Sequence, residues 1–319
     1  MNRRVFHLSI AFVTLTGLAV AQAPPAGPPA GFPPGAGRGP GRGPALPPVV
    51  IGPSAPVPPE VAMLRPTTEE IAKINEGMMT WIASDRSAAK PLLVKYQSLL
   101  MLQPTRLNTA ATYTQTVQRM GPRHLGFVET ASKGNIDLLL EGDSITDWWV
   151  QGDANKAMFD KYFGSMRTAN FAIAGDTTQG VLWGLKNGEG QGFQPKAIML
   201  MIGTNNTGGN TAPEIAEGVG AVVLEMRKDF PDAKILLLAI FPRGLPGDAV
   251  RDKIAEVNRT ISKLDDQRHV FYLDIGSKFL DEKGVFLPDS FRVDNLHPQA
   301  KGYDIWGAAV KDKLAELMK

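Results

Sequence analysis

Residues 138–144 read Leu-Leu-Leu-Glu-Gly-Asp-Ser, a short apolar run that ends in a turn and a serine. A continuous apolar run is typical of a strand buried on both faces of a parallel sheet, whereas a half-exposed strand alternates polar and apolar residues. The glycine and aspartate that follow favour a turn. We therefore predict a buried strand near 137–141 whose carboxyl end carries Ser144.

Further apolar runs of similar length follow, and amphipathic stretches separate them. The strands are expected near 137–141, 169–174, 196–202, 234–240 and 270–274, and the helices near 147–162, 178–187, 212–229, 248–264 and 299–317. This alternation indicates βαβ units with right-handed crossovers, which build one parallel sheet with helices on both faces. We expect a single catalytic domain over 121–319 without internal repeats.

Three polar islands follow predicted strands along the chain: Gly142-Asp143-Ser144, Gly203-Thr204-Asn205-Asn206 and Asp294-Asn295-Leu296-His297. Open parallel sheets place their sites at the carboxyl ends of the strands, so the islands should meet there. A serine supplies a nucleophile, a histidine the base that takes its proton, and an aspartate the acceptor that fixes the imidazole. Asn205 adds a neutral amide donor for an oxyanion.

Each residue also has a simpler interpretation. Ser144 could be an ordinary helix N-cap, although a serine at a helix start also points its own N–H toward a developing oxyanion. Of the four histidines, His7 falls in a predicted leader, and His124 and His269 precede strands at the opposite sheet edge. Only His297 follows the last strand, three residues after Asp294. The chain has no Gly-x-Ser-x-Gly elbow, which disfavours the α/β-hydrolase fold.

Several longer motifs point to a known family. They are Asn170-Phe-Ala-Ile-Ala-Gly-Asp176, Val181-Leu-Trp183, Ile202-Gly-Thr-Asn-Asn206, Pro242-Arg-Gly244 and Lys301-Gly-Tyr303. With the order Ser, Asn, Asp, His, they resemble the SGNH (GDSL-type) hydrolase superfamily, and most closely the catalytic α subunits of intracellular platelet-activating-factor acetylhydrolase. The resemblance covers about residues 121–318.

The resemblance implies a flavodoxin-like three-layer α/β/α sandwich and hydrolysis of short acyl esters. It assigns Gly175, through its backbone N–H, and Asn205, through its side chain, to the oxyanion hole beside Ser144. It also implies that a set of three side chains closes an acetyl-sized acyl pocket. These are Ile145, Thr204 and Leu296. Trp148, Trp149 and Trp183 are candidates for the cleft wall, and we take Trp183 as the substrate contact.

No cofactor and no metal are expected. The histidines are scattered and cysteine is absent, so no ligand cluster has a recognisable spacing. The spacing from Gly175 to Gly180 imitates a phosphate loop, but Val181 stands where lysine would be needed. From residue 60 onward, 30 basic residues face 32 acidic ones, which argues against nucleic acid as a partner.

The N-terminal third differs in composition. Residues 1–21 have the Arg3-Arg4 start, apolar core and small-residue end of a secretory signal peptide, so the protein is expected to be secreted or periplasmic. Residues 22–59 are rich in proline and glycine and predict a disordered linker. Over 60–120, Thr67-Thr68-Glu69-Glu70 indicates a helix start, and apolar residues at three- and four-residue spacing predict a helical extension. That extension is a helical pair packed on the catalytic domain or, alternatively, a cap over the substrate.

These patterns predict an exported serine esterase that hydrolyses short acyl, above all acetyl, esters on carbohydrate. The alternatives are a broad lysophospholipase, arylesterase or thioesterase, and a non-catalytic carbohydrate- or wall-binding protein. The expected partner is a small-molecule or polysaccharide ester, with a homodimer also open. The apolar leader is too short to span a bilayer, so no integral membrane contact is expected.

Overall fold

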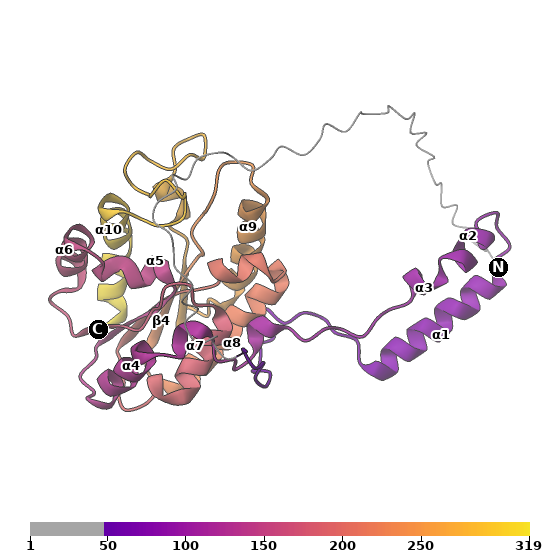
Figure 1. The fold of residues 1–319 in the computed structure, drawn as a ribbon, viewed down its shortest axis with the longest axis horizontal. Coiled ribbons are helices and arrows are strands. Elements are labelled where there is room, and N and C mark those ends of the chain that lie inside the picture. Colours follow the sequence, from indigo (N-terminus) through magenta and orange to yellow (C-terminus); the bar gives the residue numbers. More distant parts are fainter. Residues whose placement is uncertain (1–47) are drawn as a thin grey trace, which may run out of the picture. The chain divides into compact units, whose positions relative to one another are not determined.

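The computed structural model describes residues 48–319, and within them the catalytic region is built on one parallel sheet (Figure 1). The strands are β1 Leu138–Gly142, β2 Thr168–Asn170, β3 Ala197–Met201, β4 Lys234–Leu238 and β5 Val270–Leu273. Their order across the sheet is β2-β1-β3-β4-β5, and every neighbouring pair is parallel. The expected α/β fold with a five-stranded parallel sheet is therefore confirmed.

Helices cover both faces of this sheet. The α-helices are α1 Thr68–Ser84, α2 Lys90–Lys95, α3 Gln97–Leu100, α4 Pro122–Ser132, α5 Ser144–Asp147, α6 Asp153–Phe163, α7 Thr178–Gly184, α8 Ala212–Asp229, α9 Ala249–Ile261 and α10 Ala300–Leu317. Side chains of α4, α7, α8 and α9 share one apolar cluster with one face of the strands. Side chains of α5, α6 and α10 share a second cluster with the other face. The result is the expected three-layer sandwich.

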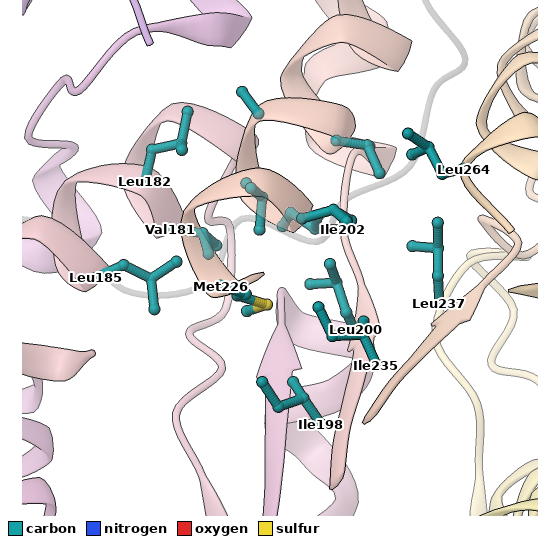
Figure 2. Close-up of a cluster of buried hydrophobic side chains, with 14 of the residues drawn as sticks. Val181, Leu182, Leu185, Ile198, Leu200, Ile202, Met226, Ile235, Leu237 and Leu264 are labelled. Atoms are coloured by element: carbon teal, nitrogen blue, oxygen red, sulfur yellow. The ribbon is translucent and has the colours of Figure 1, made fainter. Parts of the chain in front are cut away.

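The core follows from the alternation of side chains along each strand. In β3, Ile198 and Leu200 point toward α7 and α8, whereas Met199 and Met201 point toward the layer of α6 and α10. Figure 2 shows the first cluster, in which side chains of α7 and α8 meet those of β3 and β4. Because both faces are buried, no position in β1 or β3 could be polar without a partner, which explains the continuous apolar runs.

Several boundaries differ from the expected ones. The second strand ends at Asn170 rather than 174, although Phe171 and Ile173 still donate backbone hydrogen bonds to Leu140 and Gly142 of β1 before the loop that carries Gly175. The helix expected over 147–162 is divided into α5, a 3₁₀ turn at Trp148–Val150 and α6. Gly152, at a positive φ of 74°, lies between the 3₁₀ turn and α6. Helix α4 has no counterpart among the expected helices.

The N-terminal part contains the expected helical extension. Thr67 caps α1, and the reciprocal hydrogen bonds of a capping box join its side chain and backbone to Glu70. The predicted end of the linker at residue 59, however, lies too far along the chain. Ala55 is buried and pairs with Ala111, and Ser54 forms an antiparallel bridge with Thr112, so the packed chain begins before residue 59.

The predicted signal peptide, 1–21, and the linker up to residue 47 lie outside the described residues. Within residues 48–319, none of the helices combines the length and the apolar character that crossing a membrane requires.

Candidate active site

The loop after β1 sets the position of Ser144. Asp143 is the N-cap of α5, and its Oδ1 accepts a hydrogen bond from the Ile145 N–H at 3.0 Å. Gly142 is required here, since a Cβ at this position would lie 2.5 Å from the Thr146 hydroxyl. Ser144 is thus the first residue of a helix, at the carboxyl end of β1, and it is largely buried.

The structure brings Ser144, His297 and Asp294 together in one chain of hydrogen bonds. The Ser144 Oγ lies 2.9 Å from His297 Nε2, and His297 Nδ1 lies 2.8 Å from Asp294 Oδ2. An arrangement of this kind can move the serine proton to the imidazole and hold the imidazole in the required tautomer. The 294–297 island lies after the last strand, where a tight turn is closed by Asn295 at a positive φ of 50°.

Asp294 is also fixed by its own turn. Its Oδ1 accepts hydrogen bonds from the backbone N–H groups of Leu296 and His297, each at 3.0 Å. Burial alone would raise the pKa of Asp294, but the hydrogen bonds from His297 and from these two backbone groups lower it below its ordinary value. The carboxylate is therefore charged at neutral pH, as an acceptor for the imidazole N–H must be.

The imidazole has a second neighbour, the indole of Trp148. The two ring centroids are 4.0 Å apart and the planes differ by 26°, which is a stacked arrangement. The guanidinium carbon of Arg292 lies 5.1 Å from the centroid of the same indole. The Trp148 carbonyl oxygen accepts a hydrogen bond from Asn155 at 3.1 Å, so the stacked ring is anchored to the start of α6.

Gly175 and Asn205 lie on the loops after β2 and β3, next to β1 on either side. Gly175 has a φ of +83°, a backbone conformation that favours glycine. The Asn205 side-chain amide donates a hydrogen bond to the backbone carbonyl of Asp176 at 2.8 Å. This bond joins the two loops and uses one of the two amide hydrogens, so the other is available to a ligand.

A buried charge cluster lies behind these loops. Arg119, fully buried, donates to Asp176 at 2.6 Å, to Glu141 at 2.8 Å and to Glu189. Burial alone would lower the pKa of Arg119, but the three carboxylates raise it, so the guanidinium stays charged. His124 Nδ1 lies 2.6 Å from the other oxygen of Glu189. Arg119 therefore ties the segment before α4 to the end of β1 and to the Gly175 loop.

Glu141 and Asp143 are buried acids with raised pKa values. Burial raises the pKa of Glu141 to about 8, an effect that Arg119 opposes but does not cancel, and burial raises the pKa of Asp143 to about 7. One oxygen of each carboxyl group has no hydrogen-bond partner among the described residues. Asp143 and Asp176 hold their loops by accepting backbone N–H bonds, as the sequence predicts.

The side chains expected at the acyl pocket fall into two groups. Ile145 and Thr204 are almost fully buried, whereas Leu296 is partly exposed beside His297. Trp183 contacts His124 in a tilted arrangement, with 4.8 Å between the ring centroids, and it is Trp148 that stacks on the His297 imidazole. Trp149 is buried in the core against Trp306.

Two side chains near the site, Arg119 and Trp148, belong to no recognisable motif in the sequence. Arg119 precedes the first strand in a stretch with no recognisable pattern, and only the excess of buried carboxylates reveals its role. The sequence does not distinguish Trp148 from two other candidate tryptophans, and only the fold shows which of them contacts His297. Among residues 48–319, acidic and histidine side chains nowhere gather in a group of three that could hold a metal ion.

Comparison with known proteins adds a family-level result. Residues 141–305, which include all three islands, match the model of the GDSL-like Lipase/Acylhydrolase family. Among curated proteins, the chain is similar to the platelet-activating factor acetylhydrolase IB subunit alpha2 of Rattus norvegicus. The two are 36% identical over 202 residues, which cover 63% of this chain and 85% of the relative.

Solved structures show the same fold. A Streptococcus pneumonia protein described as a platelet activating factor aligns with a TM-score of 0.51 and 24% identity, over 60% of this chain and 91% of its own. A GDSL-like lipase from Bacteroides thetaiotaomicron aligns with a TM-score of 0.50 and 16% identity, over 60% and 97% of the two chains. At these identities the likeness concerns the fold alone.

Proposed function

The chain belongs to the GDSL-like lipase/acylhydrolase family and is a hydrolase of the SGNH type with esterase or acylhydrolase activity, and from this premise we propose that it removes acetyl groups from carbohydrate outside the cytoplasm. The observation that carries the proposal is the hydrogen-bonded chain from Ser144 through His297 to Asp294.

In the proposed mechanism Ser144 Oγ attacks the ester carbonyl while His297 Nε2, 2.9 Å away, takes its proton. The imidazolium that forms is stabilised by Asp294 at Nδ1. His297 then gives the proton to the leaving alcohol oxygen, which leaves an acyl group on Ser144. A water molecule activated by the same imidazole releases the acid and restores the serine.

We assign the oxyanion to three donors: the backbone N–H groups of Ser144 and Gly175 and the side-chain amide of Asn205. All three come from loops at one edge of the sheet, and the Asn205 amide is oriented by the Asp176 carbonyl. Neutral donors held in place before the reaction need little reorganisation as charge develops on the oxygen.

The acetyl specificity rests on size. Ile145 and Thr204 are buried and β-branched, so they leave their rotamers with difficulty, and Leu296 stands next to the base. The name of the rat relative, an acetylhydrolase, supports the same acyl group. Export rests on the leader at residues 1–21, and a carbohydrate acetate is the kind of ester that an exported enzyme meets.

The experiment is hydrolysis of p-nitrophenyl acetate by the wild type, Ser144→Ala and Asn205→Ala. We expect Ser144→Ala to lower kcat by up to ~10⁶, because members of a triad act as a unit. Asn205→Ala should lower kcat by about 10² to 10³ with a smaller change in KM, as the loss of an oxyanion donor does. A purified Ser144→Ala variant that retains most activity would reject the mechanism.

A phospholipid acetate is the second candidate substrate, and the name of the curated relative favours it. The two candidates share the acyl chemistry and differ in the alcohol, so a panel of acetylated oligosaccharides and acetylated phosphocholine lipids separates them. Export is tested independently by locating the protein in cell fractions of its host, where a cytoplasmic location would contradict the proposal.

A further inference from the structure

A cavity of about 500 Å³ opens beside the candidate triad. Its lining includes Trp148, Arg292 and Pro298, together with residues at the starts of α6 and α10. Trp148 also stacks on the His297 ring, and Pro298 directly follows His297 in the chain. The cavity is therefore separated from the catalytic imidazole by a single side chain.

The proposed mechanism places the alcohol half of the ester on this side. His297 must give its proton to the leaving alcohol oxygen, so that oxygen has to approach Nε2. The carbonyl oxygen, in contrast, faces the loops of Gly175 and Asn205. Groups attached to the alcohol oxygen consequently extend past the imidazole, toward its neighbours Trp148 and Pro298.

The lining offers hydrogen bonds of both kinds. The side chains of Gln151, Asp289 and Arg292 make no hydrogen bond within the described residues and are exposed at the cavity. Asn155 and Gln299 donate their amide hydrogens to backbone carbonyls, at 3.1 and 2.8 Å, which leaves their side-chain oxygens as acceptors. The apolar part of the lining comes from the indole and from alanine and proline carbons.

From this lining we propose that the cavity is a carbohydrate subsite, which binds the sugar that carries the ester; the inference rests on the proposed esterase function. Sugar hydroxyls donate and accept hydrogen bonds, which matches a set of donors and acceptors around a rigid aromatic side chain. The volume is within the range of small-ligand sites.

A phosphocholine headgroup fits less well. Its quaternary ammonium is best bound over the free face of an aromatic ring, but the Trp148 ring is already engaged by His297 and Arg292.

The test compares two substrates within one enzyme. The double variant Gln151→Ala/Asp289→Asn removes the uncommitted Gln151 amide and the charge and one acceptor oxygen of Asp289, while asparagine tolerates the positive φ of 61° at position 289. Gln191→Ala, an exposed glutamine on the loop before β3, is the matched control. The measured quantity is kcat/KM for O-acetylated xylo- and manno-oligosaccharides divided by kcat/KM for p-nitrophenyl acetate, and the fraction of folded enzyme cancels in this ratio.

We expect the double variant to lower the ratio about tenfold, mainly through KM for the oligosaccharide, and the control to leave it unchanged. An unchanged ratio in the double variant overturns the subsite while the esterase assignment stands. A wild type that hydrolyses acetylated phosphocholine lipids faster than every oligosaccharide also overturns it. Absence of p-nitrophenyl acetate hydrolysis would instead reject the proposed function itself.

Discussion

Substitution of Arg119 by methionine tests how the buried charge cluster supports the site. Methionine has a similar length and no charge, so the change removes the hydrogen bonds from Arg119 to three buried acids without opening a large cavity. Asp176 and Glu189 then remain buried without their cation, whereas Glu141, whose pKa is raised to about 8, can stay protonated at pH 7. Breaking a buried ion pair by removing one partner costs about 3 to 5 kcal/mol.

For a domain of this size, that loss corresponds to a fall in melting temperature of roughly 10 °C. Activity should fall as well, because Asp176 would lose the bond that fixes the loop, and its carbonyl orients the Asn205 amide at 2.8 Å. The assay is thermal unfolding followed by circular dichroism, together with kcat for p-nitrophenyl acetate at a temperature where both proteins are folded.

Arg167→Met is the matched control. Arg167 also binds a carboxylate, Asp137, through two nitrogens, but it lies on the surface, where water replaces the lost pair. It should leave the melting temperature nearly unchanged. Adding Glu189→Gln to Arg119→Met should restore part of the stability, since one unpaired carboxylate disappears. If Arg119→Met unfolds at the same temperature as Arg167→Met, the cluster does not stabilise the fold as argued.

Three further predictions follow from named contacts. The folded protein holds the Glu141 proton up to about pH 8, whereas the unfolded chain releases it above about pH 4.5. The free energy of unfolding should therefore fall as pH rises from about 4.5 to 8, and Glu141→Gln should flatten this slope in thermal melts. An equal slope in both proteins contradicts the assignment. Trp148→Ala should lower kcat about tenfold with little change in KM, because the His297 ring loses the indole on which it stacks. Trp148→Phe should recover most of the lost kcat. Equal losses of kcat in the two variants contradict a stacking role. In the wild type, each methylene added to the acyl chain gains ~0.8 kcal/mol of burial at most, while overpacking the pocket costs about 1 to 3 kcal/mol. Leu296→Ala should therefore flatten the decline in kcat/KM from p-nitrophenyl acetate to octanoate. Faster octanoate hydrolysis by the wild type contradicts the acetyl pocket.

The sheet could be predicted because burial on both faces leaves a direct trace in sequence. The run 197–201 is apolar at every position, and so is most of 234–238, which makes their strands unambiguous. The second strand is shorter than its apolar run, since Phe171, Ala172 and Ile173 are buried although they lie beyond its last residue, Asn170. Apolar character records burial, not hydrogen bonding, so it cannot mark where a strand ends.

Side chains that act through long-range contacts could not be predicted in the same way. The three islands identified Ser144, Asp294 and His297 because together they hold the residue types of a triad and each comes after a predicted strand. Arg119 meets its partners over separations of 22 to 70 residues, and no local pattern marks a buried arginine. The proline-rich composition around Ala55 likewise indicated a linker, although backbone pairing with residue 111 holds that segment in place.

The most direct test of a Ser144 nucleophile is covalent labelling. The protein is treated with a fluorophosphonate, which forms a stable bond to a serine activated by a neighbouring base, and the modified peptide is identified by mass spectrometry. We predict one adduct per chain, on Ser144, with loss of p-nitrophenyl acetate hydrolysis in proportion to labelling and no adduct in Ser144→Ala. An adduct on a different serine, or full labelling of Ser144 without loss of activity, would contradict the account.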